Sequence, residues 1–326
     1  MILDKKYHTY QGYECLSACI SNYLRWKNIN IKASDIFFLG NGFCLFYEKD
    51  TERILSDMYM SNYSFMENYH INYEVRSAED KKVAKAILQE NILKEEMIMI
   101  KVAAEGLEYN RVYQQAGDSQ HFLNTIGIND TSVFVSDGFV PTRKFSVYEG
   151  WVYLENIMRV WERKNYDYYV INFPENFENN DEIHEKVKNM IIFSLLEYVK
   201  IVERDDKIYG YSAMIHVIDN LREKLLDENY PLSERTLYLN HQFRVCGFVS
   251  AKKMLLEEMV YYGIDSDLCN EYQIIVNRWS RWLMIMVKIG FSRRLNEFEI
   301  LYSDMIKIIE KENELLMFIA VAFRML

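Results

Sequence analysis

The chain contains few of the two residues that most often interrupt regular structure. Its 326 residues include only 3 prolines and 12 glycines, which end helices and mark turns. We therefore expect long, uninterrupted helices. Half of the residues are hydrophobic and 26% are charged, a composition typical of globular proteins rather than disordered ones. A chain of this length can bury one large core or two smaller ones.

The hydrophobic pattern changes near Pro174. Before it, short runs rich in Ile, Val, Phe and Tyr alternate with helical patterns, and Asn129-Asp130 reads as a hairpin turn between two of the runs. The strands predicted in this part cover residues 97–102, 122–128, 132–136 and 168–173, and the helices cover 15–27, 34–39, 78–91 and 147–163.

After Pro174 every segment has a helical pattern, with apolar residues three and four apart. The polar run 175–181 predicts a domain boundary. We expect an α+β catalytic domain over residues 1–175 and an α-helical domain over residues 176–326. The predicted helices of the second domain cover residues 181–203, 207–227, 233–262, 267–289 and 292–326.

Charge and cysteine content exclude several classes of protein. The net charge is −10 and the acidic residues are spread along the chain, whereas nucleic-acid binding needs clustered Lys and Arg. The five cysteines are odd in number and lack the spacing of a disulfide framework. The N-terminus lacks the apolar run of a secretory signal, and no apolar stretch is long enough to span a bilayer. We expect a cytoplasmic protein with reduced thiols and no membrane or nucleic-acid partner.

Cys15 is the candidate nucleophile, because it begins a predicted helix. A thiol on a first helical turn faces unpaired backbone N–H groups, which favour the thiolate. In the preceding turn Gln11 is placed to donate its amide, and with the Cys15 N–H it would form an oxyanion hole. We expect Glu14 to face solvent or to bind an amine, because its charge would otherwise raise the pKa of the thiol. Without a partner, Cys15 would be read as a buried small hydrophobe.

His121 and Asp137 supply that partner. His121 stands at the head of one predicted strand, and Asp137 ends the next strand after the hairpin turn. The first residue of one strand lies opposite the last residue of the other in a tight hairpin. The two residues are therefore predicted to be neighbours, with the carboxylate fixing the tautomer of the imidazole. The alternative is a solvated strand end followed by an unrelated Asp-Gly turn.

Other polar residues are weaker candidates. Cys19 lies one helical turn after Cys15, but no second ligand pair stands at zinc spacing, so we expect a core role and no metal. His8 lacks a carboxylate at fixed geometry, and Cys44 is expected to be buried rather than to line the site. The chain contains no phosphate-binding loop. The sequence therefore does not support ATP-driven ligation, and we expect no cofactor.

The order of Gln11, Cys15, His121 and Asp137 resembles that of the papain-like cysteine peptidases. More specifically, three segments resemble the N-terminal domain of the butirosin biosynthesis protein H family, in which a cysteine opens a helix and a Leu-Gly-x-Gly segment follows a second short helix. The resemblance covers residues 8–175. The three segments read Gly-Tyr-Glu-Cys at 12–15, Asn-Tyr-Leu at 22–24 and Asp-Ile-Phe-Phe-Leu-Gly-Asn-Gly at 35–42.

The resemblance implies a papain-like fold, in which an N-terminal helix packs on an antiparallel sheet, and a triad of Cys15, His121 and Asp137. It also implies acyl transfer in the biosynthesis of natural products such as antibiotics. An acyl or peptidyl carrier protein would donate the acyl group as a thioester, and a small amine would accept it as an amide. The helical domain would then be a lid or a docking surface.

Two alternatives stay open from the sequence. The same triad fits a peptidase, an amide hydrolase or a thioesterase, because the chemistry differs only in what resolves the acyl-enzyme. A degenerate peptidase fold used as a scaffold would leave Cys15 an ordinary, slow thiol.

Overall fold

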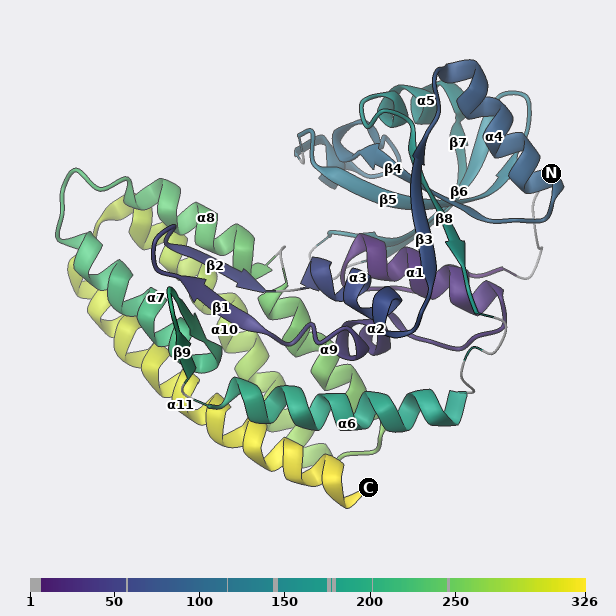
Figure 1. Ribbon diagram of the computed structural model, residues 1–326. Helices are drawn as coiled ribbons and strands as arrows, with labels where there is room; N and C mark the ends of the chain where they lie inside the picture. Colours follow the sequence, from purple (N-terminus) through teal and green to yellow (C-terminus); the bar gives the residue numbers. More distant parts are fainter. Residues whose placement is uncertain are drawn as a thin grey trace. The chain divides into compact units, whose positions relative to one another are not determined.

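A computed structural model shows two compact units, each made of two separate stretches of sequence (Figure 1). The first unit consists of Met1–Ile36 and Asn62–Ile183, and the second of Phe37–Ser61 and His184–Leu326. The chain therefore leaves the first unit after residue 36 and returns to it at residue 62. The structure describes residues 7–56, 58–115, 117–142, 146–174, 177, 180–200, 202–244 and 247–326.

The first unit is built on an antiparallel sheet of six strands. The hairpin between residues 128 and 132 turns at Asn129, whose side chain accepts from the N–H groups of Thr131 and Ser132 at 2.9 and 2.7 Å. The predicted hairpin is thus confirmed. In order across the sheet the strands are β3 (Asn72–Ser77), β8 (Asp167–Asn172), β4 (Ile98–Ala103), β5 (Gln120–Ile128), β6 (Ser132–Val140) and β7 (Ser146–Tyr153).

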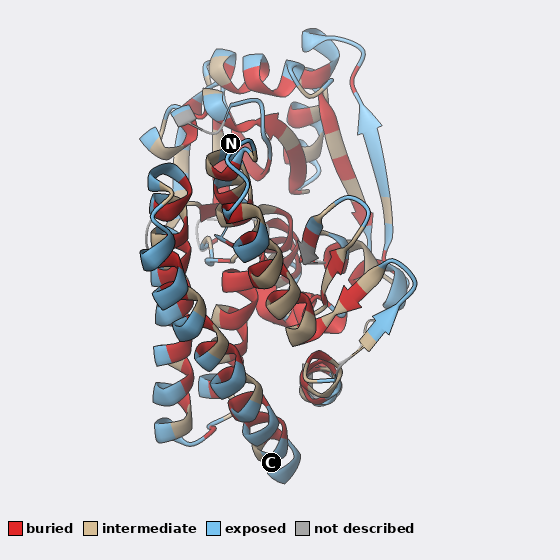
Figure 2. Cartoon of the chain, turned by 90° about the vertical axis from the view of Figure 1, so that its left-hand side faces the viewer, coloured by how far each residue is buried: buried red, intermediate tan, exposed pale blue. Residues whose placement is uncertain are grey.

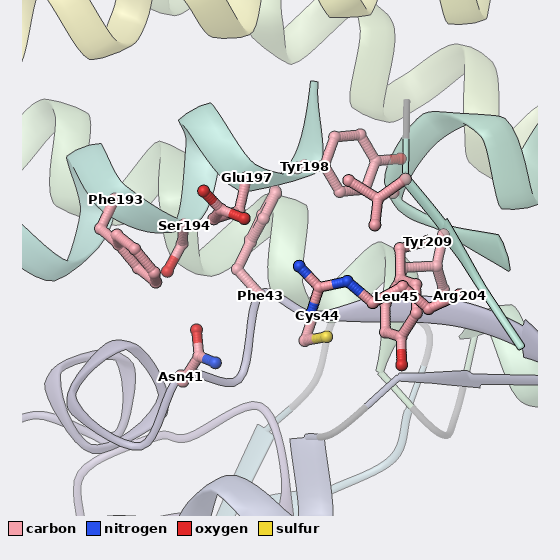
Figure 3. A pocket seen from close by; sticks show the side chains of 12 residues that line it. Asn41, Phe43, Cys44, Leu45, Phe193, Ser194, Glu197, Tyr198, Arg204 and Tyr209 are labelled. Atoms are coloured by element: carbon pink, nitrogen blue, oxygen red, sulfur yellow. The ribbon is translucent and has the colours of Figure 1, made fainter. Parts of the chain in front are cut away.

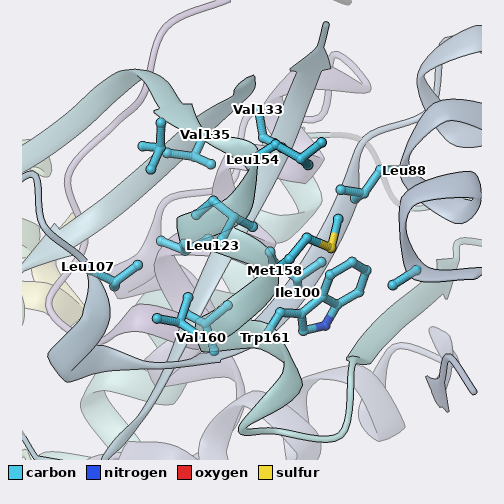
Figure 4. Packing of buried hydrophobic residues seen from close by; sticks show 14 of the residues in the cluster. Leu88, Ile100, Leu107, Leu123, Val133, Val135, Leu154, Met158, Val160 and Trp161 are labelled. Atoms are coloured by element: carbon cyan, nitrogen blue, oxygen red, sulfur yellow. The ribbon is translucent and has the colours of Figure 1, made fainter. Parts of the chain in front are cut away.

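Helices cover both faces of this sheet, and the alternation along β6 separates two cores. Val133 and Val135 join the larger core, in which Trp161 is fully buried (Figure 4). Phe134 points to the opposite face and packs with Tyr23 in a smaller cluster. The larger core holds residues of α4 (Lys81–Leu93) and α5 (Leu154–Glu162), and the smaller one holds residues of α1 (Cys15–Trp26).

The second unit combines long helices with a small antiparallel sheet. Its helices carry buried residues along one side and exposed residues along the other (Figure 2). The sheet has the order β2 (Arg53–Ser56), β1 (Leu45–Glu48), β10 (Lys207–Tyr209) and β9 (Val202–Arg204). The helices are α7 (Gly210–Leu225), α8 (Leu232–Arg244), α9 (Phe248–Tyr261), α10 (Ser266–Ser292), α11 (Leu295–Met325) and most of α6 (Asn180–Tyr198).

Two further helices contain the points where the chain passes from one unit to the other along the sequence. They are α2 (Ala33–Leu39) and α3 (Met58–Asn68). Among the described residues, no helix is both long enough and apolar enough to cross a membrane.

The α+β class, the antiparallel sheet and the helical C-terminal region are confirmed, but the predicted division at 175/176 differs from the observed one. Residues 37–61 belong to the second unit, and the later crossing lies at 183/184. The cause is a long-range pairing, in which Phe46 of β1 stands opposite Tyr209 of β10. A hydrophobic pattern along the chain does not reveal which distant strand completes a sheet.

Several predicted helices are wrong in extent. The segment 147–163 begins as strand β7 and becomes helical only at Leu154. Strand β7 lies at the edge of the sheet and buries little surface, so the sequence gives only a weak signal of its two-residue period. The segment 233–262 is two helices, and Gly247 before the second one takes a φ of 130° that favours glycine. Strand β3 was not predicted, since five of its six residues are exposed.

The core of the second unit contains a buried ion pair between Lys252 of α9 and Glu312 of α11. The side chains are 1% and 2% exposed, and the Trp279 Nε1–H donates to the second oxygen of Glu312 at 2.8 Å. The ammonium of Lys252 also lies 4.0 Å from the ring centre of Phe248. Each charge therefore depends on its partner, because neither has access to water.

Glu312→Gln should lower the free energy of unfolding by about 3–5 kcal/mol, because it leaves the Lys252 charge buried without a counterion. The double variant Lys252→Met/Glu312→Gln should recover at least half of that loss. Urea unfolding followed by helical circular dichroism measures both. Glu299→Gln, which breaks an exposed ion pair with Arg222, is the matched control and should cost about 1 kcal/mol or less. Equal losses for Glu312→Gln and the control would contradict this account.

Candidate active site

The candidate nucleophile begins α1, and the residue before it caps that helix. Glu14 has an extended backbone, and its carboxylate accepts from the N–H groups of Leu16 and Ser17, both at 2.8 Å. A carboxylate at this position satisfies two orphan donors and the positive end of the helix dipole. The expectation that Glu14 faces solvent or binds an amine is therefore wrong for this conformation.

The thiol of Cys15 is hydrogen-bonded to the same carboxylate. Cys15 Sγ lies 3.2 Å from Glu14 Oε1, and the residue is half-buried. Burial, followed by the charge of Glu14, raises the pKa of the Cys15 thiol well above its ordinary value, while the N–H of Phe122 works in the opposite direction. The structure therefore does not favour the predicted thiolate form of Cys15, because Glu14 occupies the helix N–H donors that would stabilise the sulfur anion.

Two glycines bring the backbone before Cys15 against β6. The Gly12 N–H donates to the carbonyl of Gly138 at 2.8 Å. A Cβ on Gly12 would stand 2.6 Å from the Cβ of Ala18, and one on Gly138 would stand 2.8 Å from the carbonyl of Tyr10. Only glycine allows this close approach. Because Gly138 follows Asp137 in β6, the contact holds the segment before α1 next to Asp137.

A buried asparagine fixes the same segment from the helix side. Asn22 accepts from the Tyr10 N–H at 2.8 Å and donates to the Tyr10 carbonyl at 2.9 Å. From the sheet, Asn124 donates to the carbonyl of Cys19 at 2.9 Å. Both amides are almost fully buried, so the thiol-bearing helix has one position relative to β5 and β6.

The structure brings His121 and Asp137 together. His121 Nε2 lies 3.1 Å from Asp137 Oδ1, and the residues are 4% and 0% exposed. They are not directly opposite in the ladder, because Asn124 pairs with Ser136 and that register sets Asp137 two residues away from the position facing His121. The contact is therefore diagonal across the two strands, at a reach that long side chains span.

Asp137 also receives three donors that the sequence did not reveal. The Phe139 N–H donates to Oδ1 at 3.0 Å, while the hydroxyls of Tyr109 and Tyr113 donate to Oδ2 at 2.6 and 2.5 Å. The Tyr113 hydroxyl is also 3.1 Å from His121 Nε2. Tyr113 lies in the 3₁₀ turn η2 (Arg111–Gln115), which has no hydrophobic period and gave no sequence signal.

These contacts decide the charge state of the cluster. Burial alone would raise the pKa of Asp137, but His121, Tyr109 and Tyr113 outweigh it and hold the pKa of this carboxyl below its usual range. Burial and the charge of Asp137 raise the pKa of both tyrosines, so each remains a donor at neutral pH. A fixed carboxylate thus orients His121 with Nε2 engaged, which leaves Nδ1 as its other ring nitrogen for proton transfer.

The thiol lies at the start of β5 but is not bonded to the imidazole in this state. Its sulfur contacts the N–H of Phe122, the residue that follows His121. Within the described part of the chain, its side-chain hydrogen bond goes to Glu14, and none joins it to His121. The arrangement can carry out nucleophilic chemistry once the thiol proton moves from the Glu14 contact to the base.

The other candidate residues differ in their burial and surroundings. Gln11 is exposed, and none of the hydrogen bonds described above involves it. Cys19 is buried, and burial together with Asp137 and Glu14 raises its pKa well above the ordinary value. Cys44 is half-buried and belongs to the second unit. Among the described residues, no three His, Cys, Asp or Glu side chains form a cluster that would hold a metal ion.

A thiol at the start of a helix, packed on an antiparallel sheet that carries a histidine–aspartate pair, resembles the arrangement of the papain-like cysteine peptidases. Residues 14–138 match the family model described as butirosin biosynthesis protein H, N-terminal. The match begins one residue before Cys15 and ends one residue after Asp137, and Gln11 lies outside it.

Among solved structures, the chain resembles one titled crystal structure of a putative C39-like peptidase from Bacillus anthracis. The two share 10% sequence identity with a TM-score of 0.35, and the alignment covers 53% of this chain and 98% of that one. No curated protein matches the sequence.

Glu14→Gln should make Cys15 more reactive, because it removes the nearest negative charge while keeping an oxygen for the helix cap. The pH profile of iodoacetamide alkylation at Cys15, mapped by peptide mass spectrometry, should move to lower pH. Glu96→Gln, which removes an exposed carboxylate paired with Lys27 at the other end of α1, should leave the profile in place. An unchanged or upward-shifted profile for Glu14→Gln would show that Glu14 does not hold the thiol proton.

Tyr113→Phe should cost about 1.5–3 kcal/mol of stability at neutral pH, the range for a hydrogen bond to a charged group. Because the pKa of Asp137 is lower in the folded protein, its stabilising contribution is present above the unfolded pKa and is lost as the pH falls through the folded value. The deficit of Tyr113→Phe should therefore shrink towards acid pH in urea unfolding. Tyr148→Phe, which removes a surface hydrogen bond to the Trp151 carbonyl, should cost less, with no such pH dependence.

Proposed function

We propose that the protein is a cysteine-dependent acyltransferase that forms an amide from a carrier-protein thioester through an acyl-Cys15 intermediate. The observation that carries the proposal is the buried His121–Asp137 contact on the sheet beside the helix that begins with Cys15. The match to the butirosin biosynthesis protein H family over this same region supports biosynthetic acyl transfer rather than protein degradation. The proposed catalytic residues are Cys15, His121 and Asp137.

The first half of the proposed reaction transfers the acyl group to the enzyme. The Cys15 thiol leaves its contact with Glu14 and gives its proton to His121, and the sulfur attacks the thioester carbonyl. The Cys15 N–H and the Gln11 amide are the proposed donors to the resulting oxyanion. The carbon–sulfur bond to the carrier breaks, and His121 returns the proton to the departing carrier thiolate.

The second half passes the acyl group to the amine. The amine nitrogen attacks the carbonyl of acyl-Cys15, His121 accepts the proton that the nitrogen loses, and Cys15 leaves and is reprotonated. Asp137 holds the imidazole in one orientation through both halves, because three further donors fix its own carboxylate. A thioester is already activated, so the sequence of steps needs no nucleotide. The proposed partners are an acyl or peptidyl carrier protein and a small amine, with the second unit as the lid or docking surface.

The test is to mix the protein with an N-acetylcysteamine thioester, which mimics a carrier-bound acyl group, and to measure acyl-enzyme by intact mass and product by chromatography. Wild type should show a stable mass increase on the peptide that contains Cys15, followed by amide when an amine is added. Cys15→Ala should show neither. His121→Asn should slow acylation by about 10²–10⁴-fold, while His8→Asn, which changes an exposed histidine, should behave as wild type.

The other outcomes separate the rival functions. Turnover of the thioester at the same rate with and without amine would identify a thioesterase or hydrolase that uses the same residues. Acylation of Cys15 at the rate of an unstructured thiol, unchanged by His121→Asn, would contradict catalysis at this site and favour a scaffold role.

A further inference from the structure

The second unit contains a cavity of about 210 Å³ between α6 and the small sheet (Figure 3). Its apolar wall includes Phe43, Leu45 and Tyr198, which are 6%, 4% and 5% exposed, and the rings of Phe43 and Tyr198 meet edge to face at 5.4 Å. The volume is below the ~300–1,000 Å³ of pockets for drug-sized ligands. The cavity therefore fits a short chain or a single ring.

One buried polar group in the cavity lacks a partner in the described part of the chain. Ser194 of α6 is 2% exposed, lines the cavity, and its Oγ forms no hydrogen bond with any described residue. In Figure 3 its hydroxyl points from α6 towards the cavity. Buried hydroxyls are normally paired, so an oxygen of a bound molecule would complete this position.

Among the described residues that line the cavity, one cation has no ion-pair partner. Glu197 lines the cavity, but its carboxylate is paired with Lys200 on the same segment. Lys252, which lines a smaller adjoining hollow, is paired with Glu312. Arg204 reaches from β9 into the cavity, and no described carboxylate forms an ion pair with it (Figure 3). Its guanidinium is the group that would select the charge of a ligand.

We propose that this cavity binds a small carboxylate with a short aliphatic or aromatic body. The carboxylate accepts from the Arg204 guanidinium, the Ser194 hydroxyl donates to a ligand oxygen, and the apolar body packs against Phe43, Leu45 and Tyr198. Cys44 lines the same cavity, so an occupant should shield its thiol. The proposal concerns the second unit alone and does not depend on acyl transfer at Cys15.

The experiment is calorimetric titration of the whole chain with hexanoate, hexanamide and hexylamine, which share one apolar chain and differ in charge. Hexanoate should bind at least about tenfold more tightly than the other two, since a charge-assisted hydrogen bond to Arg is lost in both. Arg204→Gln should abolish this preference, and Arg204→Lys, which keeps the charge but not the fork, should retain part of it. Ser194→Ala should weaken hexanoate binding about three- to tenfold.

The matched control is Arg53→Gln, because Arg53 is an exposed arginine of β2 in the same small sheet and lies outside the cavity. It should bind hexanoate as wild type does. Hexanoate should also slow iodoacetamide labelling of Cys44 in wild type and Arg53→Gln but not in Arg204→Gln. Absence of saturable hexanoate binding, equal affinity for hexylamine, or binding unaffected by Arg204→Gln would overturn the proposal.

Discussion

The candidate site depends on one buried carboxylate. Asp137 is fully inaccessible to water, and it persists as an anion because donors come from β5, from its own strand and from the segment around η2. The donors come from three parts of the first unit, so β5, β6 and the segment around η2 must all be in place before the charge is tolerated. The orientation of His121 follows from that assembly rather than from the imidazole itself.

The second constraint is competition for the start of α1. The helix offers N–H groups that stabilise either a thiolate or a carboxylate, and in this structure the carboxylate of Glu14 occupies them. Cys15 then remains a protonated thiol that donates to Glu14. The structure thus combines an imidazole held by Asp137 with a Cys15 thiol held by Glu14.

Much of the fold could be predicted from local signals. The hairpin turn at Asn129, the helix that begins at Cys15 and the long C-terminal helices all have short-range causes, namely turn chemistry, capping and a 3.6-residue period. Edge strands such as β3 and β7 were not predicted, because they are short or mostly exposed and bury few of their side chains. The small sheet of the second unit was not predicted, because its strands are short and its pairing joins residues 45–48 to residues 207–209.

The sequence by itself determined which residue types stand at the site and which elements carry them: a cysteine at a helix start, and a histidine and an aspartate on successive strands. Only the tertiary structure decided how they meet. The diagonal register of His121 and Asp137, the arrival of Tyr109 and Tyr113, and the capture of the thiol by Glu14 all depend on side chains far apart in sequence or on a choice between two uses of the same donors. Local propensity does not encode these three features, because each depends on which partners a buried charge finds in the folded protein.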